Sequence, residues 1–281
     1  MVPRIDAHTH IFPPAQAARR FALSETDQTF REIYADSNAK MATTEDLLAA
    51  LDSDGIDAAV SVGFAFTGEE EIESQNRYVL DSAKLAKRRL APLAILNLCH
   101  PGWREVAEGA LSDGARGFGE LRPHNQGWDP LGPDAHRLCE LAAAHGVPLL
   151  WHVSEPLGHG YPGKHGGIGP LELAALAAAH PATRMVAAHL GGGLSFFLQM
   201  PEVKQSLSNI WFDTAAAFLL YDEQSISRLV GLAGKERVLF ASDYPLLSPR
   251  RQLDRIIASL PSGSADAVCG ANAQKLFFGY A

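Results

Sequence analysis

Eight short apolar runs alternate with helical stretches along this chain, and the alternation limits its fold more than any other feature. The runs are rich in aliphatic and β-branched residues, which favour strands. A typical helical stretch begins at a capping Thr43 or Thr44 and ends at Gly55. The pattern predicts a (β/α)8 barrel; an open doubly wound sheet shares it, but eight units in series favour closure. The predicted strands cover residues 4–11, 57–64, 90–98, 115–121, 147–153, 184–190, 210–216 and 238–245.

Two inserts interrupt the series within what we expect to be a single domain over residues 1–281. One covers about residues 13–42, after the first strand, and the other about 154–169, after the fifth. Both follow the C-terminal end of a strand, which is the face where barrel enzymes build their active sites. We therefore expect both inserts to shape a binding site.

Composition and charge exclude several kinds of partner. The 281 residues are 47% hydrophobic and carry a formal net charge of −8 without a run of Lys or Arg. This balance argues against nucleic acid or an anionic membrane as the main partner. There is no long apolar segment and no signal-peptide pattern near the start, so we expect a cytoplasmic protein. A small-molecule substrate is the expected partner, and a homodimer is left open.

Histidine and carboxylate side chains recur at the ends of the predicted strands. In a strand, His8 and His10 would project to one face while Ala7 and Thr9 point away. Each such residue alone could be a hydrogen-bonded core residue, but six at one barrel mouth form the ligand set of Zn²⁺ or a similar divalent ion. The six are His8, His10, Glu120, His152, His189 and Asp243.

Polar side chains in the segments after strands four and five are predicted to wall the cavity and bind substrate. Arg122 has an alternative role in a salt bridge to Glu120 or Glu155, and Lys164 an alternative as part of a solvated loop. We expect Glu155 to pair with Arg122 or Lys164 and to orient the pocket without binding metal. The predicted substrate-binding residues are Arg122, His124, Glu155, His159, Tyr161 and Lys164.

Four segments together resemble the amidohydrolase superfamily, and more closely its amidohydrolase-related branch. That branch contains the aminocarboxymuconate-semialdehyde decarboxylase type, related aromatic-acid decarboxylases, and lactone or amide hydrolases. The resemblance runs from residue 4 to the closing NAQKLF segment and implies a (β/α)8 barrel. The segments that carry it are DAHTHIF (6–12), LLWHV (149–153), MVAAHLGGG (185–193) and FASDYPL (240–246).

The resemblance also implies roles for particular residues. A metal would be held by His8, His10, His152 and Asp243, and His189 would act near the metal-bound water or the substrate. Two departures stand out: no proline follows His152, and Glu120 lies on strand four. In the metal-dependent deoxyribonuclease branch a strand-four glutamate bridges two metals. Glu120 could therefore hold a second ion, contribute to the first, or bind Arg122; a single-metal site with Glu120 pointing into it is favoured.

The chemistry expected from this site is hydrolysis by a metal-activated water. The expected ion is zinc, with manganese or iron as alternatives. A bound divalent ion lowers the pKa of water to about 7, which makes hydroxide available at neutral pH. Asp243 would accept the proton of that water, and His189 would stabilise or protonate the oxyanion. The substrate would be a small carboxylated or cyclic lactone, amide or ester. The alternatives are non-oxidative decarboxylation of an aromatic or muconate-type acid, and an inactive metal-binding scaffold.

Overall fold

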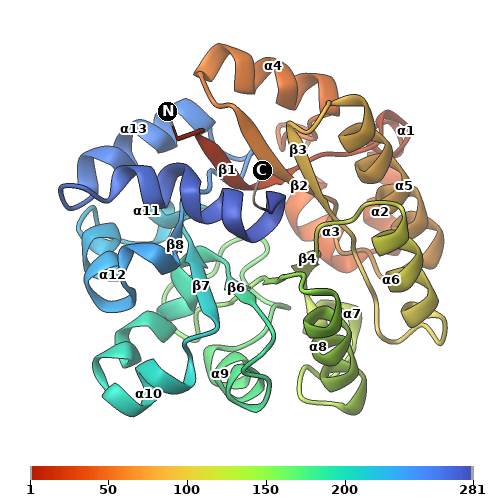
Figure 1. The fold of residues 1–281 in the computed structure, drawn as a ribbon. Helices are drawn as coiled ribbons and strands as arrows, with labels where there is room; N and C mark the ends of the chain where they lie inside the picture. Colours follow the sequence, from red (N-terminus) through yellow and green to blue (C-terminus); the bar gives the residue numbers. More distant parts are fainter. Residues whose placement is uncertain (1, 280–281) are drawn as a thin grey trace.

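The computed structural model describes residues 2–279, and eight parallel strands form its centre, with helices packed around them (Figure 1). Each of the eight predicted runs contains one strand, although the strands are shorter than the runs. Residues 1, 280 and 281 of the predicted domain lie outside the described residues. The strands are β1 (Ile5–His10), β2 (Ala58–Val62), β3 (Leu90–Leu93), β4 (Phe118–Leu121), β5 (Leu149–Trp151), β6 (Met185–Ala187), β7 (Ile210–Asp213) and β8 (Val238–Leu239).

Backbone contacts join the strands into a closed ring. Continuous parallel ladders connect β1 to β3 and β4 to β8. A parallel bridge between Ala94 and Phe118 links β3 to β4, and another between Thr9 and Tyr244 links β1 to the segment after β8. At this last seam the Asp243 amide donates to the His8 carbonyl over 3.1 Å. The predicted (β/α)8 barrel is confirmed, with its first and last strands side by side.

Helices cover the outside of the ring, and their ends follow the expected signals. The helix after residue 42 begins where Thr43 accepts a hydrogen bond from the Asp46 amide, and it ends at Gly55 in the left-handed conformation. Among residues 2–279, no helix has the length and apolarity needed to cross a bilayer. The α-helices are α1 (Pro14–Ala18), α2 (Arg20–Thr26), α3 (Gln28–Tyr34), α4 (Thr44–Asp54), α5 (Glu69–Leu85), α6 (Trp103–Ser112), α7 (Pro123–Gln126), α8 (Pro133–His145), α9 (Pro170–Ala179), α10 (Pro201–Ser206), α11 (Ala217–Leu220), α12 (Ser225–Ala233) and α13 (Pro249–Ser259). Tighter or wider helical turns occur at η1 (His189–Gln199), η2 (Lys235–Arg237), η3 (Ala267–Ala271) and η4 (Gln274–Phe278).

The first insert folds into α1–α3 and is tied to the barrel by a buried carboxylate. Asp27 caps α3 by accepting from the Phe30 amide over 2.9 Å. Its other oxygen accepts from the amide and hydroxyl of Thr67, which follows β2, over 2.9 and 3.0 Å. Because both oxygens are used, this insert is anchored at the C-terminal end of the strands. The second insert, residues 154–169, contains no helix or strand.

The capping interaction at the start of α4 gives a first prediction. Thr43→Ala removes the side chain that satisfies the Asp46 amide, so the free energy of unfolding should fall by about 1 kcal/mol in urea denaturation. Thr43→Ser keeps the hydroxyl and should stay close to the wild type. Equal stability of all three proteins would contradict the prediction.

Candidate metal centre and cavity

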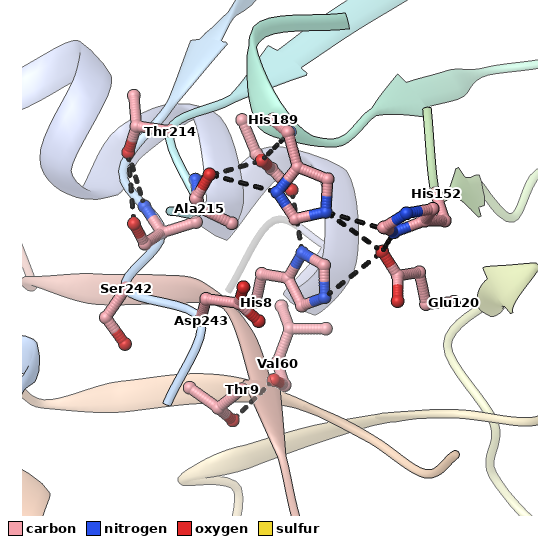
Figure 2. Close-up of polar contacts among 12 residues, drawn as sticks. His8, Thr9, Val60, Glu120, His152, His189, Thr214, Ala215, Ser242 and Asp243 are labelled. Carbon is pink, nitrogen blue, oxygen red and sulfur yellow. Dashed lines mark hydrogen bonds and ion pairs between the residues drawn. The ribbon is translucent and has the colours of Figure 1, made fainter. Parts of the chain in front are cut away.

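Six side chains from the ends of five strands converge at the C-terminal mouth of the barrel, as the spacing along the sequence predicts. Figure 2 shows five of them: His8, Glu120, His152, His189 and Asp243. They form two groups of possible metal ligands, and within each group the ligand atoms lie within 4.8 Å of one another. One group is His8, His10 and Asp243, and the other is Glu120, His152 and His189.

A bulge in β1 sets the direction of the two leading histidines. In the pairing of β1 with β2, Asp6 lies opposite Ala59 and Thr9 opposite Ser61, so that Ala7 and His8 together oppose Val60. A bulge of this kind turns two successive side chains towards one face. Ala7 therefore packs in the same buried cluster as Val60, whereas simple alternation predicts that it points away. The bulge places His8 and His10 in the barrel mouth.

Three of the four histidines are held by their Nδ1 atoms, which leaves Nε2 towards the centre. This arrangement is typical of metal-ligating histidines, because a hydrogen bond at Nδ1 fixes the tautomer and the direction of the ring. His152 differs, since its Nδ1 faces Glu120 and its Nε2 is buried without a partner among the described residues. The Nδ1 contacts are His8 to Asp213 Oδ2 at 2.9 Å, His10 to the Gly63 carbonyl at 3.1 Å, and His189 to the Ala215 carbonyl at 3.0 Å.

Glu120 lies between the two groups and reaches both of them. Its Oε1 is 2.8 Å from His152 Nδ1 and 3.4 Å from His189 Nε2. The same oxygen is 3.8 Å from His8 Nε2, and Oε2 is 3.9 Å from His10 Nε2. A carboxylate in this position can serve an ion in either group or bridge two ions. It forms no salt bridge with Arg122 in the part of the chain that the structure describes.

The three glycines after His189 form a left-handed turn that packs tightly against the barrel. Positive φ values run from His189 to Gly193. A Cβ on Gly191 would lie 2.8 Å from the Phe212 ring, and one on Gly192 would lie 3.0 Å from the Ser154 carbonyl. The two glycines therefore permit close packing of the backbone behind His189. Neither of them lines the cavity, so their role is to position the imidazole.

The buried carboxylates of the site stay ionised because histidines surround them. Burial tends to raise the pKa of Glu120, but the charge and hydrogen bonding of His152 outweigh it and hold the pKa well below the usual range. Burial tends to raise the pKa of Asp243 as well, but the hydrogen bond from His10 brings it to about 2. Both carboxylates are thus ionised and can serve as ligands of a cation.

The pKa values of the histidines shift in opposite directions. Burial tends to lower the pKa of His8, but the hydrogen bond to Asp213 and the charge of Glu120 raise it to about 9. For His189, the hydrogen bond to Glu120 likewise outweighs burial and raises the pKa to about 10. Burial and the positive charge of Arg122 lower the pKa of His152 to about 4. The protons on His8 and His189 would compete with a metal ion.

A cavity of about 360 Å³ opens above this centre. Its polar lining includes three of the predicted substrate-binding residues, Arg122, His159 and Tyr161. Its apolar walls come from both predicted inserts and from the segments after β2, β7 and β8. They include Ile33, Tyr34, Phe64, Leu219, Leu220 and Leu246.

Arg122 is a buried cation at the edge of the cavity. One nitrogen, Nη2, donates to the carbonyls of Gly163 and His165 over 2.7 and 3.0 Å, which fixes the second insert to β4. Nη1 lies 3.4 Å from His152 Nδ1, and Nε has no hydrogen-bond partner among residues 2–279. Arg122 therefore holds the loop and also brings positive charge to the cavity, in place of the expected salt bridge.

Two other predicted substrate-binding residues have structural contacts outside the cavity lining. The Nε2 atom of His124 lies 3.0 Å from Glu172, in the first turn of α9. Lys164 is buried, and its ammonium donates to the carbonyls of three residues in its own loop, Leu157, Gly158 and His159. These three bonds fold the loop back on itself. Lys164 is thus neither the solvated residue of the alternative reading nor a group that faces the cavity.

The expected partners of Glu155 are wrong. Its carboxylate accepts hydrogen bonds from the hydroxyls of Tyr161 and Tyr221. Tyr221 follows α11, so these bonds join the second insert to the segment after β7. Arg122 and Lys164 are not available to Glu155, because both donate to backbone carbonyls instead. Glu155 lies outside the cavity lining, behind Tyr161.

Asp213, which orients two of the histidines, was not among the predicted site residues. Besides binding His8, Asp213 accepts through Oδ1 from the His189 and Ala215 amides over 3.0 and 3.1 Å. A signal was present, since this carboxylate lies within the seventh predicted run, as Glu120 does within the fourth. The lining residues of the first insert, Ile33 and Tyr34, carried no such signal.

Comparison with known proteins identifies the family. The sequence model of the amidohydrolase family matches residues 5–279. The chain belongs to the amidohydrolase family. It is therefore an enzyme of the superfamily that the four sequence segments resemble, and the family match spans both candidate ligand groups. No curated protein sequence matches the chain.

Solved structures of other amidohydrolases share the fold across almost the whole chain. The 5-carboxyvanillate decarboxylase of Sphingomonas paucimobilis is 18% identical with a TM-score of 0.76, and the match covers 99% of each chain. The enzyme of the same name from Novosphingobium aromaticivorans is 16% identical with a TM-score of 0.76, covering 99% of this chain and 97% of that one. The 2,6-dihydroxybenzoate decarboxylase from Rhizobium is 17% identical with a TM-score of 0.73, covering 99% of both.

The contact between Asp213 and His8 predicts a loss of metal affinity in this amidohydrolase. In Asp213→Asn, an amide N–H can replace the acceptor at His8 Nδ1, which would move the ring proton to Nε2 and remove the ligand lone pair. We expect Mn²⁺ or Zn²⁺ affinity to fall by about 10- to 100-fold in a competitive chelator titration. The exposed Asp222→Asn is the matched control. Unchanged affinity in Asp213→Asn, with a wild-type circular dichroism spectrum, would show that His8 needs no such partner.

The two tyrosine hydroxyls on Glu155 predict an effect on substrate binding alone. Glu155→Gln replaces one acceptor oxygen by a donor, so Tyr161 and Tyr221 can no longer both donate. The cavity wall should loosen, and KM should rise several-fold while elemental analysis finds the metal content of the wild type. Wild-type kinetics on the substrate that the enzyme turns over would show that this loop only closes over the barrel.

Proposed function

We propose that this amidohydrolase is a metal-dependent decarboxylase that removes CO₂ from a small aromatic or muconate-type acid without oxidation. The observation that carries the proposal is the cavity itself: apolar walls lie above a cluster of histidines and carboxylates, with the Arg122 guanidinium at the edge. Such a cavity suits a flat acid whose carboxylate meets the polar floor. Hydrolysis, the function first expected from the sequence, has less support.

Several structural neighbours favour decarboxylation over hydrolysis. The 5-carboxyvanillate decarboxylase of Novosphingobium aromaticivorans was solved with manganese and 3-methoxy-4-hydroxy-5-nitrobenzoic acid. A 2,6-dihydroxybenzoate decarboxylase was solved with 2,6-dihydroxybenzoate. At 16–17% identity these likenesses show the fold, and the step from their substrates to this chain is part of the proposal. Manganese joins zinc as the proposed ion.

The residues at the mouth fit a divalent cation. Nε2 of His10 lies 3.5 Å from Asp243 Oδ1, and ligand atoms of His8, His10 and Asp243 all lie within 4.8 Å of one another. The Nδ1 hydrogen bonds of His8 and His10 fix both rings. This imidazole and carboxylate donor set suits Zn²⁺ or Mn²⁺. We assign the ion to His8, His10, His152 and Asp243. Glu120 completes the site or bridges to a second ion held with His189.

In the proposed reaction the bond between the carboxylate carbon and its neighbour breaks, CO₂ leaves, and a proton takes its place. When bound, the ion would polarise a substrate oxygen and stabilise the negative charge left on carbon. Arg122 would bind the acid through charge, and the apolar walls would exclude water from the carbanion. His189 would hold the incoming proton at Nε2, because Ala215 occupies its Nδ1.

Elemental analysis of protein purified without chelator tests the ion. About one equivalent of Zn or Mn is expected, or about two if Glu120 bridges. If the wild type binds two equivalents of metal, Glu120→Gln should bind one. A protein without metal, whose melting temperature does not respond to added zinc, manganese or iron, would contradict the assignment.

Turnover tests the reaction. Protein loaded with Mn²⁺ or Zn²⁺ should release CO₂ from one or more acids among 2,6-dihydroxybenzoate, 5-carboxyvanillate and a muconate acid. His189→Asn should lose most of this activity and keep its metal, because the imidazole supplies a proton. Hydrolysis of lactones or esters without CO₂ release would favour the original expectation. Metal binding without either activity would favour the scaffold alternative.

A further inference from the structure

The first insert presents one tyrosine to the cavity, in a position that neither the sequence motifs nor the proposed mechanism explains. Tyr34 is the last residue of α3 and lies in the cavity lining with His10 and Asp243. Only 8% of its surface is exposed. Its role therefore concerns the interior of the cavity.

The ring of Tyr34 is held rigidly by other aromatic side chains. The Phe12, Phe30 and Phe64 ring centroids lie 5.0, 5.1 and 5.6 Å from the Tyr34 centroid. The Phe12 and Phe64 rings meet the Tyr34 ring edge-on, which is a favourable arrangement for aromatic pairs. The hydrogen bonds of Asp27 to Thr67 anchor the same insert, so the phenol is fixed before any ligand arrives.

The hydroxyl of Tyr34 lacks a protein partner. No residue from 2 to 279 forms a hydrogen bond with it, although Tyr161 and Tyr221 donate to Glu155 and the Tyr78 hydroxyl accepts from a backbone amide. The Tyr34 oxygen is not one of the fully buried polar atoms that lack a partner, so it reaches the open cavity. A phenylalanine would fill the aromatic cluster equally well. The hydroxyl is thus explained by what enters the cavity.

The surroundings of the phenol determine which ligand atoms suit it. Burial, together with the carboxylates of Asp243 and Glu120, raises the pKa of Tyr34, so the hydroxyl keeps its proton and acts as a donor. Its ligand partner is therefore an acceptor oxygen. Arg122 lies at the same cavity, which favours an anionic molecule as the carrier of that oxygen.

We infer that Tyr34 is a substrate-binding residue whose hydroxyl donates a hydrogen bond to an oxygen of the bound acid. The inference rests on the proposed function for the identity of the ligand as a small acid. In a hydroxylated acid, the acceptor oxygen can belong to the carboxylate or to a hydroxyl group on the ring. Since the insert carries Tyr34, this contact gives residues 13–42 a direct part in substrate choice.

Calorimetric titration of Mn²⁺-loaded protein with two probes tests the inference without turnover. 2-Nitroresorcinol, an inhibitor bound in the dihydroxybenzoic acid decarboxylase structure from Polaromonas, carries ring oxygens and a nitro group in place of a carboxylate. Benzoate carries the carboxylate alone. Tyr34→Phe should weaken binding by about tenfold, the effect of one hydrogen bond to a charged or polar acceptor. Weakening of both probes assigns the contact to the carboxylate position, and weakening of 2-nitroresorcinol alone assigns it to a ring oxygen.

Tyr78→Phe is the matched control, because it removes a phenol oxygen that accepts from the Thr44 amide on the outside of the barrel. This control should bind both probes like the wild type and lose thermal stability. Tyr34→Phe should keep the thermal stability of the wild type, since the hydroxyl has no hydrogen bond to residues 2–279 to lose. Wild-type affinity of Tyr34→Phe for both probes overturns the inference alone. A wild-type protein that binds neither probe overturns the proposed function together with it.

Discussion

Closure of the parallel sheet is the constraint on which the site depends. The C-terminal ends of eight strands meet at one mouth only if β1 pairs with the segment after β8 and β3 pairs with β4. Both of those junctions are single bridges with a few backbone hydrogen bonds, in contrast to the continuous ladders elsewhere. The β1 bulge lies in the pairing with β2, and the turn at Asp243 lies at the junction with β1. Irregular backbone on both sides of β1 therefore directs the ligands inward.

The chemistry of the centre follows from its charges. Glu120, Asp213 and Asp243 bring three carboxylates into a buried space, and protonated histidines or a cation must balance them. Burying a carboxylate without a partner costs free energy. Each of the three therefore interacts with an imidazole or with backbone amides. Asp213 is wholly inaccessible and acts through its two histidines. Arg122 adds positive charge on the opposite side, towards the cavity.

The sequence was informative where structure follows from local patterns. Apolar runs located all eight strands, and the ends of five of these runs located the six converging side chains. The contacts that hold the second insert escaped prediction because Arg122 and Lys164 bind backbone carbonyls, which every residue has and no motif marks. The predicted partners of Glu155 were wrong for the same reason. Arg122 and Lys164 donate to backbone carbonyls, so neither is available to pair with Glu155. Tyr34 escaped because its place in the cavity depends on the packing of a separate insert.

The hydrogen bonds between His8, His10 and the residues around Asp243 have a consequence for folding. The two segments that meet there come from opposite ends of the chain, so their pairing closes a loop of almost the full sequence length. A cation held by these residues, as proposed, would act on that loop as a cross-link does, by lowering the entropy lost when the ends come together. Metal binding and barrel closure would then be coupled equilibria. The same site would stabilise the fold and supply the chemistry.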